Sequence, residues 1–320
     1  MNRFLALLSS MLLAASCNFI PLYDLSGNVQ INLDFQLEQQ VDIPQGFLTR
    51  DSVNLSKKAL GSLPQTMQVK FFEPETHRLV KDQFLSSAGG QVNIPAGTYD
   101  ILIYSLGSEY SQIWGVESRS GIYAFTNTAG TLNYNTDSWS SIKEPDHVYT
   151  AKLENVEVPS FESASGHIAY VINADASSIL DTYTFEMTNV DGIDNIDECA
   201  LYITAQEGRS FLWGNREGET LSALKFTAYP DRDNHRIFSV FNTFGRFKDS
   251  REKVWVILYV RNLAGDQFMA RFDLTDQFDD PDNTGHNLKI TDKVTIPEGS
   301  SQGGFDPSVI GWDDPIIITN

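Results

Sequence analysis

Cysteine is scarce in this sequence. The 320 residues hold two, Cys17 and Cys199, too few for the disulfide frameworks that stabilise small secreted domains. Long apolar runs are also missing beyond the first residues. The longest obvious one, residues 254–260, has the length of a strand and is too short to cross a bilayer as a helix. These shortages exclude a disulfide scaffold and a membrane-spanning helix in the body of the chain.

The sequence also lacks the short motifs of common catalytic centres. It contains no HExxH, GxSxG, P-loop, GxGxxG or CxxC pattern. The histidines are scattered: His77, His147, His167, His235 and His286. Catalytic residues can be assembled from distant positions, so missing motifs do not exclude every enzyme. We expect a protein that is not an enzyme and has no cofactor or metal, and an envelope hydrolase is the least favoured alternative.

Positive charge is the third shortage. Lys and Arg number 23 against 42 Asp and Glu, which gives a formal net charge of -19. An acidic surface repels polyanions, so nucleic acid is not expected as a partner, nor is an anionic lipid surface. Hydrophobic residues make up 41% of the chain and aromatic residues 12%, enough to exclude a disordered chain. The composition therefore predicts a folded, acidic body.

The first residues have the layout of a secretory signal peptide. In residues 1–16, the basic Arg3 precedes an apolar run, and small residues precede Cys17. This arrangement looks like a bacterial lipobox, although Ala14 stands where leucine is commoner. We expect residues 1–16 to be removed and Cys17 to carry acyl chains such as palmitate that anchor the protein to a membrane. The alternative is ordinary signal cleavage with Cys17 as a free thiol. If Cys17 is acylated, Cys199 has no partner and is expected to pack as a small buried hydrophobe.

Side chains of alternating polarity run through most of the chain. Ile31, Leu33 and Phe35 alternate with polar residues, which is the pattern of a half-buried strand. Similar strands are expected at 67–71, 98–104, 121–127, 148–158 (with a bulge), 167–173, 183–187, 200–204, 224–229, 237–241, 254–261, 267–274 and 288–296. Many short strands separated by turn residues indicate an all-β fold made of sandwiches or barrels.

Chain length and the placing of turn residues predict two domains. About 300 residues exceed a usual single domain, and residues 159–166 read as a linker. We expect an N-terminal β-sandwich over residues 17–158 and a C-terminal β-sandwich over 159–297. Residues 298–320 would form a flexible segment with a terminal strand. Ile316, Ile317 and Ile318 make that strand apolar on both faces. It either closes the second sandwich or adds to a partner's open sheet.

A few residues are candidates for binding or catalysis. Asp146 and His147 are adjacent, as in an acid–base pair, but they open a strand and fit a turn better. The acidic loops at 191–198 and 273–283 could offer oxygen ligands to calcium, yet neither has EF-hand spacing, so solvated loops are expected. Trp213 lies in a loop where an exposed indole would stack on a sugar ring. Core packing is the commoner role of such an aromatic residue.

Several segments together resemble a known family. They are the leading lipobox, the hairpin at residues 95–101, the segment at 145–149, and the closing segments at 303–306 and 311–315. This combination is similar to the fimbrillin-like lipoproteins of the Bacteroidota, near the minor-fimbrium anchor subunits. The resemblance implies two tandem transthyretin-like (Greek-key) β-sandwich domains and lipid anchoring in the outer membrane at the cell surface.

The same resemblance implies a route of assembly. Some members of the family exchange strands between subunits after an arginine-directed protease removes a leading strand, whereas anchors remain lipidated. The matching positions here are Arg50 and, as a weaker candidate, Arg119. The leading interpretation is therefore a structural or adhesive surface lipoprotein that joins other fimbrial subunits. A glycan-binding surface lipoprotein is the alternative.

Overall fold

A computed structural model describes residues 28–38, 62–115, 118–160, 170–213, 220–247, 251–298 and 312–313. Cys17, Arg50 and Ile316 to Ile318 lie outside these residues. Within them, no helix has both the length and the apolar character needed to cross a membrane. The fold is all-β, as expected. The helical segments among the described residues are the short α3 (Thr275–Phe278), η2 (Arg119–Gly121) and η3 (Ile193–Asn195).

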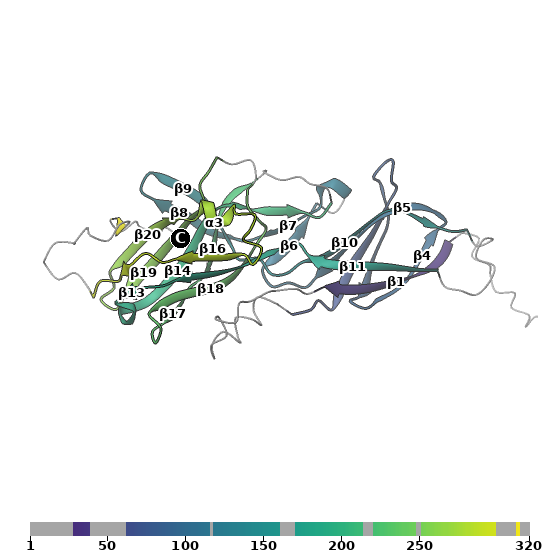
Figure 1. Ribbon diagram of the computed structural model, residues 1–320. Helices are drawn as coiled ribbons and strands as arrows, with labels where there is room; N and C mark the ends of the chain where they lie inside the picture. Colours follow the sequence, from purple (N-terminus) through teal and green to yellow (C-terminus); the bar gives the residue numbers. More distant parts are fainter. Residues whose placement is uncertain are drawn as a thin grey trace, which may run out of the picture.

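Seven strands close into a barrel, which forms one end of the molecule in Figure 1. They are β1 (Asn28–Glu38), β2 (Thr66–Phe72), β3 (Leu79–Ser86), β4 (Gly89–Pro95), β5 (Gly97–Leu106), β10 (Tyr149–Val158) and β11 (Tyr170–Ser178). Their order around the barrel is β1-β11-β10-β5-β2-β3-β4, and β1 pairs with β4 to complete it. Alternate side chains point inward and form one apolar core, as the period of two predicts.

The remaining strands build a second body around a larger core. A seven-stranded sheet has the order β23-β20-β19-β14-β16-β9-β8, and a four-stranded sheet has the order β17-β18-β12-β21. Their bounds are β8 (Thr128–Tyr134), β9 (Asp137–Lys143), β12 (Asp181–Met187), β14 (Ile196–Glu207), β16 (Leu221–Thr227), β17 (Tyr229–Asp231), β18 (Arg236–Thr243), β19 (Trp255–Asn262), β20 (Gln267–Asp273), β21 (Asn287–Ile290) and β23 (Trp312–Asp313). Buried residues of both sheets share one cluster, as in a sandwich.

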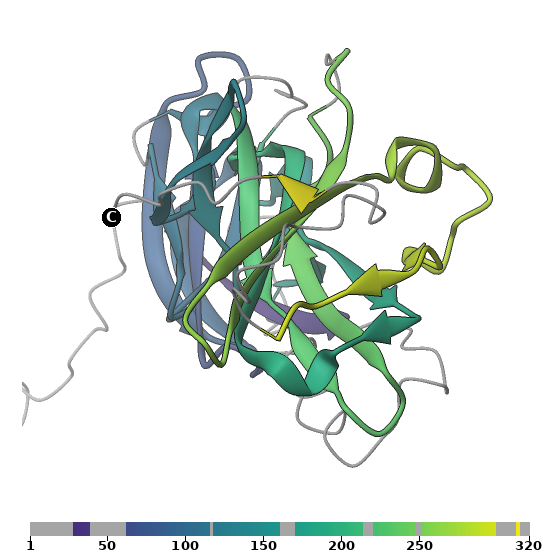
Figure 2. The same cartoon turned by 90° about the vertical axis from the view of Figure 1, so that its left-hand side faces the viewer.

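Two smaller sheets complete the second body. One joins β6 (Ser111–Trp114), β7 (Tyr123–Thr126) and β15 (Arg209–Phe211), and the other joins β13 (Val190–Asp191) and β22 (Val294–Thr295). Figure 1 shows the barrel and the second body end to end, and the view along that axis in Figure 2 superimposes them. Phe72, Leu102 and Tyr104 extend from the barrel strands into the larger core, so the two bodies are joined by apolar packing.

Sheet membership does not follow the expected boundary between residues 158 and 159. Strand β11 comes after that point, yet it pairs with β1 and β10 in the barrel. Strands β6 to β9 come before it, yet β9 pairs in parallel with β16 of the second body. The sequence could not reveal this crossing, because strand pairing depends on contacts between distant segments and not on local composition.

Most of the expected strands are present, and the bulge predicted within residues 148–158 is confirmed. Strand β10 shifts register against β5 between Leu153 and Val156, where Asn155 adopts a positive φ of 53°. The bulge leaves the Asn155 amide free to donate to Asp100 Oδ1 at 2.9 Å. Strands β3, β8 and β9 were not expected, since their polar and small residues carry a weak alternation signal.

Candidate assembly site

Strand β1 has one apolar face and one polar face. Ile31, Leu33 and Phe35 point into the barrel and are 0%, 2% and 6% exposed. Gln30 and Asp34 point outward to solvent. Burying each inward side chain stabilises the barrel by about 1.5–3 kcal/mol. These three residues are the ones whose spacing predicted the strand.

Two long ladders hold β1 in place. It is antiparallel to β4 from the pair Asn28 and Pro95 to the pair Asp34 and Gly89. It is parallel to β11 from the pair Ile31 and Tyr170 to the pair Glu38 and Ser177. Strand β1 therefore lies between two strands that are far from it in sequence, and most of its backbone groups have partners.

The ladders that pair β4 and β11 with their other barrel neighbours are much shorter. In the described ladders, β10 and β11 share the pairs Tyr149 with Ser178 and Thr150 with Ser177, and β3 meets β4 at Ser86 and Gly89. Because β4 and β11 are joined to each other through β1, removing β1 would open the barrel along its length. It would leave two facing rows of unpaired backbone groups.

Gly89 allows β1 to lie close to β4. Its φ is +99°, and a Cβ placed there would lie 1.9 Å from the carbonyl oxygen of Leu33. A side chain at residue 89 would thus displace the backbone of β1. Gly89 was not among the residues predicted to matter, although consecutive glycines at 89 and 90 are a recognised hairpin signal.

A second point of strand addition lies at the edge of the seven-stranded sheet. Trp312 and Asp313 of β23 pair antiparallel with Ala270 and Met269 of β20. The chain near its C-terminus therefore does add to a sheet of its own second body. Residues 316–318 follow three residues later, outside the described part of the chain.

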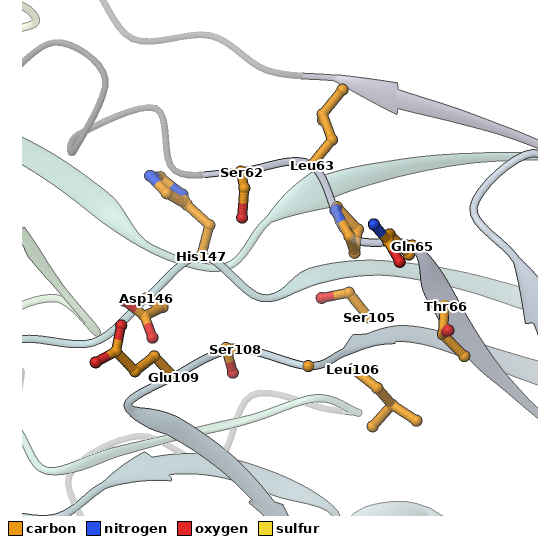
Figure 3. Close-up of a pocket in the computed structure, with 12 residues that line it drawn as sticks. Ser62, Leu63, Gln65, Thr66, Ser105, Leu106, Ser108, Glu109, Asp146 and His147 are labelled. Carbon is orange, nitrogen blue, oxygen red and sulfur yellow. The ribbon is translucent and has the colours of Figure 1, made fainter.

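A polar cleft of about 710 Å³ lies beside the first residues of β2, at the end of the barrel that meets the second body (Figure 3). Ser62 to Thr66, Ser105 to Glu109, Asp146 and His147 line it. In Figure 3 the side chains of Asp146 and His147 leave the backbone in different directions. The two residues are close in space, but they do not face each other as an acid–base pair would.

Asp146 and His147 make structural contacts in the irregular segment between β9 and β10. Asp146 Oδ2 accepts a hydrogen bond from the Tyr110 amide at 2.5 Å, and its carbonyl accepts one from Ser111 Oγ at 2.8 Å. His147 Nδ1 lies 2.8 Å from Ser178 Oγ, a hydroxyl that also accepts from the Leu180 amide at 3.2 Å. The Asp146 contacts tie this segment to the start of β6, and the His147 contact ties it to the end of β11.

Arg119, the weaker candidate for processing, is held in a buried ion pair. Its guanidinium contacts the carboxylate of Asp100, and the two side chains are 15% and 4% exposed. The guanidinium also lies over the Trp213 ring, 4.6 Å from its centroid. A protease needs an extended, accessible segment around the bond it cuts. The geometry of Arg119 is unsuitable, which leaves Arg50 as the candidate.

Trp213 is packed and not presented to solvent. It is 5% exposed and belongs to the larger core. With Arg119 over its ring and core residues around it, the indole offers no free face for a sugar. The burial of Trp213 agrees with core packing, the expected role, and argues against the alternative of a glycan contact.

Cys199 behaves as expected of a partly buried hydrophobe. It packs against the larger core, and its Sγ donates weakly to the Ala228 carbonyl at 3.6 Å. Burial raises the pKa of the Cys199 thiol to about 12, so the reactive thiolate is rare at neutral pH. The described residues contain no cluster of three or more His, Cys, Asp or Glu side chains suited to a metal ion.

The loop at residues 275–286 is held by hydrogen bonds within the loop and by contacts with Arg246 and Tyr183. Asp279 forms an ion pair with Arg246, and Asn283 Nδ2 donates to the carbonyls of Gln277 and Asn287, at 2.9 Å each. Tyr183 is stacked between Phe278 and His286, with ring centroids 4.5 Å from each. Hydrogen bonds and ring stacking thus account for the shape of this acidic loop.

Comparison with known proteins gives relatives along nearly the whole chain. A Bacteroides ovatus protein named "Putative fimbrium anchoring subunit Fim4B" is 23% identical over 346 aligned positions, covering 97% of this chain and 95% of the relative. The crystal structure of a "putative adhesin" from Bacteroides ovatus has a TM-score of 0.61 and 17% identity, covering 89% of this chain and 98% of its own. This likeness confirms the fold.

A further solved structure is "The fimbrial anchor protein Mfa2 from Porphyromonas gingivalis", with a TM-score of 0.49 and 11% identity over 82% of this chain and 89% of its own. The relatives agree with the resemblance that the sequence motifs indicated. Residues 53–224 match the family described as "Domain of unknown function (DUF5119)", and this match spans more than half of the 320 residues. The chain thus belongs to the DUF5119 family.

Proposed function

We propose that this protein is a structural or adhesive subunit of a bacterial fimbrium, either an anchor or a minor subunit, at the cell surface. The observation that carries the proposal is the position of β1 as the single strand joining β4 to β11. The name of the Bacteroides ovatus relative, a fimbrium anchoring subunit, supports it. In this role the protein works by main-chain pairing with a partner and performs no catalytic step.

The proposed mechanism is β-strand addition. An open barrel would present the free edges of β4 and β11 on either side of an apolar slot. Val92 and Ile94 of β4, 1% and 0% exposed, and Ile172 of β11, 7% exposed, would line that slot. A partner strand with apolar residues at alternate positions would pair with both edges and refill the core. Such a strand reproduces what Ile31, Leu33 and Phe35 do in the closed barrel.

The donor segment that we propose is the C-terminal one. Ile316, Ile317 and Ile318 follow the β23 segment. In an extended strand Ile316 and Ile318 point to the same side, so they can fill the slot while Ile317 lies on the outer face. The same segment would either finish the sheet edge at β20 of its own molecule or enter a neighbour. The pairing of β23 with two residues of β20 is consistent with the first of these arrangements.

In this proposal the lipidated residue precedes β1 in the sequence, and the processed residue follows it. We propose that residues 1–16 are a signal peptide and that Cys17 carries the lipid that anchors the chain in the outer membrane. Arg50, which we propose as the processing site, follows β1 in sequence. A cut there would leave β1 on the lipid side and the body on the other. An uncut chain would act as an anchor and a cut chain as an assembling subunit.

We also propose that the two bodies are transthyretin-like, as the family resemblance implies. The seven-stranded and four-stranded sheets that share the larger core support this for the second body. In the first body, the seven strands would be the closed form of such a sandwich. We propose two domains whose division departs from the expected limits of 17–158 and 159–297, because β11 belongs to the first body and β6 to β9 belong to the second.

The test uses the mature chain before and after treatment with an arginine-specific protease. A fluorescent peptide of residues 312–320 is titrated into both forms, and binding is measured by anisotropy. We expect binding to the cut form alone, because only that form can lose β1. Arg50→Ala is the matched control, which should remain uncut and should not bind the peptide.

Two results would overturn the proposal. One is a cut form that has released residues 28–38 and yet binds no peptide. The other is equal binding by the cut and uncut forms, which would place the peptide at a site other than the slot. A peptide with Ile316→Asp and Ile318→Asp provides the specificity control, because carboxylates in the slot would be buried without a partner.

A further inference from the structure

The three-stranded sheet of β15, β7 and β6 carries a set of aromatic side chains on one face. Its register places Phe211, Tyr123 and Trp114 in one cross-strand row. The adjacent row consists of Arg209, Phe125 and Gln112. Directly paired residues point to the same side of a sheet, as do residues two apart, so all six side chains share one face. We call these six residues the aromatic face.

The opposite face of this sheet packs against the larger core. Ala124 is 0% exposed and belongs to that core, and Ile113 packs against it. The aromatic face must therefore point away from the core. In an antiparallel sheet with one buried face, the outward face is normally polar. Aromatic residues on the outward face of such a sheet, with Trp114 largely exposed, point to an interaction site.

Trp114 is the most accessible member of the aromatic face. It is 64% exposed, whereas Tyr123 and Phe125 are half-buried and Phe211 is 9% exposed. The Tyr123 ring lies 5.8 Å from that of Phe125 and 5.4 Å from that of Phe211. These packed rings form a supported base, from which the Trp114 indole extends along the row to solvent.

Polar groups of the aromatic face are held in fixed positions. The Arg209 guanidinium lies 5.0 Å from the Tyr123 ring centroid and 5.3 Å from that of Phe211. Gln112 Nε2 donates to Asn127 Oδ1 at 3.0 Å, which orients the exposed amide. Tilted, packed rings beside an oriented amide and a guanidinium combine apolar surface with directional hydrogen bonding.

We propose that the aromatic face binds a neutral oligosaccharide. The C–H face of a pyranose ring stacks on an indole, and its hydroxyl groups exchange hydrogen bonds with an amide and a guanidinium. Trp114 offers the free ring for this stacking, and the half-buried rings of Tyr123 and Phe125 extend the apolar surface beside it. Phe211 is buried with the Arg209 guanidinium over its ring, so it supports the face and takes no part in the stacking. A surface that continues past one indole suits consecutive sugars of a chain better than one compact ligand.

The charges of this face favour a neutral ligand. The aromatic face holds one cation and no carboxylate, while the whole chain has a formal net charge of -19. A polyanion would be repelled by the rest of the body, and a cationic peptide would find no acidic group on this face. The register and exposure of this sheet do not involve β1, so sugar binding here is independent of the proposed fimbrial role.

The test is a binding screen of the full mature chain against immobilised neutral oligosaccharides. The panel contains cello-, malto-, xylo-, manno- and chito-oligosaccharides of two to six sugars, and hits are measured by isothermal titration calorimetry. We expect at least one series to bind, with affinity rising with chain length. Trp114→Ala should weaken that binding about tenfold or more, and Gln112→Ala should weaken it less. Trp114→Tyr should restore most of it, since a ring is kept.

Phe84 supplies a matched control, because it is an aromatic residue 61% exposed on β3 of the barrel. Phe84→Ala should leave oligosaccharide affinity unchanged, and thermal unfolding should show all variants folded. Three results would overturn the proposal. They are no binding anywhere in the panel at millimolar concentration, equal loss in Trp114→Ala and Phe84→Ala, or self-association of the wild-type chain that Trp114→Ala abolishes. The last would identify the face as a contact between copies of the chain.

Discussion

Arg119 and Asp100 form an ion pair at the junction between the second body and the barrel. Arg119 lies in η2, between β6 and β7, whereas Asp100 lies on β5. The same carboxylate accepts the amide of Asn155 at the bulge of β10, and the same guanidinium lies 2.9 Å from His77 Nε2. One buried pair therefore holds the bulge, a barrel loop and the second body together.

The first prediction concerns this pair. Arg119→Ala leaves the Asp100 carboxylate buried without a counter-ion, so the free energy of unfolding should fall by about 3–5 kcal/mol. Asp100→Asn combined with Arg119→Met should recover most of that loss, because no charge is then left buried. Urea unfolding measures both. Arg78→Ala removes an exposed ion pair with Glu73 and should have no measurable effect. Equal stability of Arg119→Ala and wild type would contradict the assigned role.

The second prediction concerns the contact between Gly89 and β1. Gly89→Ala should cost about 2 kcal/mol more stability than Gly107→Ala, because the new methyl group displaces the Leu33 carbonyl and breaks ladder hydrogen bonds. Gly107 is the matched control, since it also has a positive φ (+88°) but a methyl group there would have nothing within 4 Å. Both variants place an alanine at a positive φ and so strain the backbone, but only Gly89→Ala brings a methyl group into collision with the Leu33 carbonyl. Equal losses of stability in the two variants, measured by denaturant unfolding, would contradict the close contact between Gly89 and β1.

The sequence predicted β1 well and its neighbours poorly. Ile31, Leu33 and Phe35 alternate because each faces the core, and that pattern is local and readable. The pairing of Leu33 with Gly90 on one side and Ile172 on the other is not local, and nothing in the composition of the three segments specifies it. The pairing of β1 with β4 and β11, which makes β1 a candidate assembly strand, could therefore be seen only in the fold.

Single aromatic residues were equally hard to place from sequence. The sequence left Trp213 with two roles, core packing and an exposed glycan contact, and the fold packs it into the larger core with Arg119 over its ring. Trp114 ends a four-residue strand and was not predicted to be exposed, yet it is the more exposed of the two. Two alternating positions on each short strand are too few to show which face the core will cover.

The third prediction tests lipidation by counting thiols. The chain has two cysteines, so a mature chain acylated on Cys17 retains one thiol, that of Cys199. The native lipidated protein should react slowly with a thiol reagent at pH 8, because burial raises the Cys199 pKa to about 12. In denaturant we expect one reactive thiol per chain. Two reactive thiols would show that Cys17 is not acylated.

The fourth prediction is a pH dependence that arises from Asp231. Burial alone would raise the pKa of this carboxyl, but hydrogen bonds from Asn234 and Arg236 outweigh burial and lower it from the ordinary value of 3.8. The folded state thus binds this proton less readily than the unfolded state. The resulting stabilisation is complete above the unfolded pKa and is lost as the pH falls through the folded pKa.

Urea unfolding between pH 6 and pH 2.5 measures this effect. The free energy of unfolding of the wild-type chain should fall below about pH 4, and Asp231→Asn should show a shallower fall over the same window. Asp233→Asn removes an exposed carboxylate of the same turn and controls for the loss of one negative charge. Parallel profiles for Asp231→Asn and wild type would refute the assigned hydrogen bonds.

The most direct measurement of the central claim is strand exchange at β1. The mature chain is cut after Arg50 and incubated with a fluorescent peptide of residues 28–38, and incorporation is followed by anisotropy and size-exclusion chromatography. The claim that β1 is a replaceable strand between β4 and β11 predicts that the cut chain incorporates this peptide, that the uncut chain does not, and that a Leu33→Asp peptide fails. A cut chain that releases its own β1, stays folded and still refuses the peptide would contradict the account.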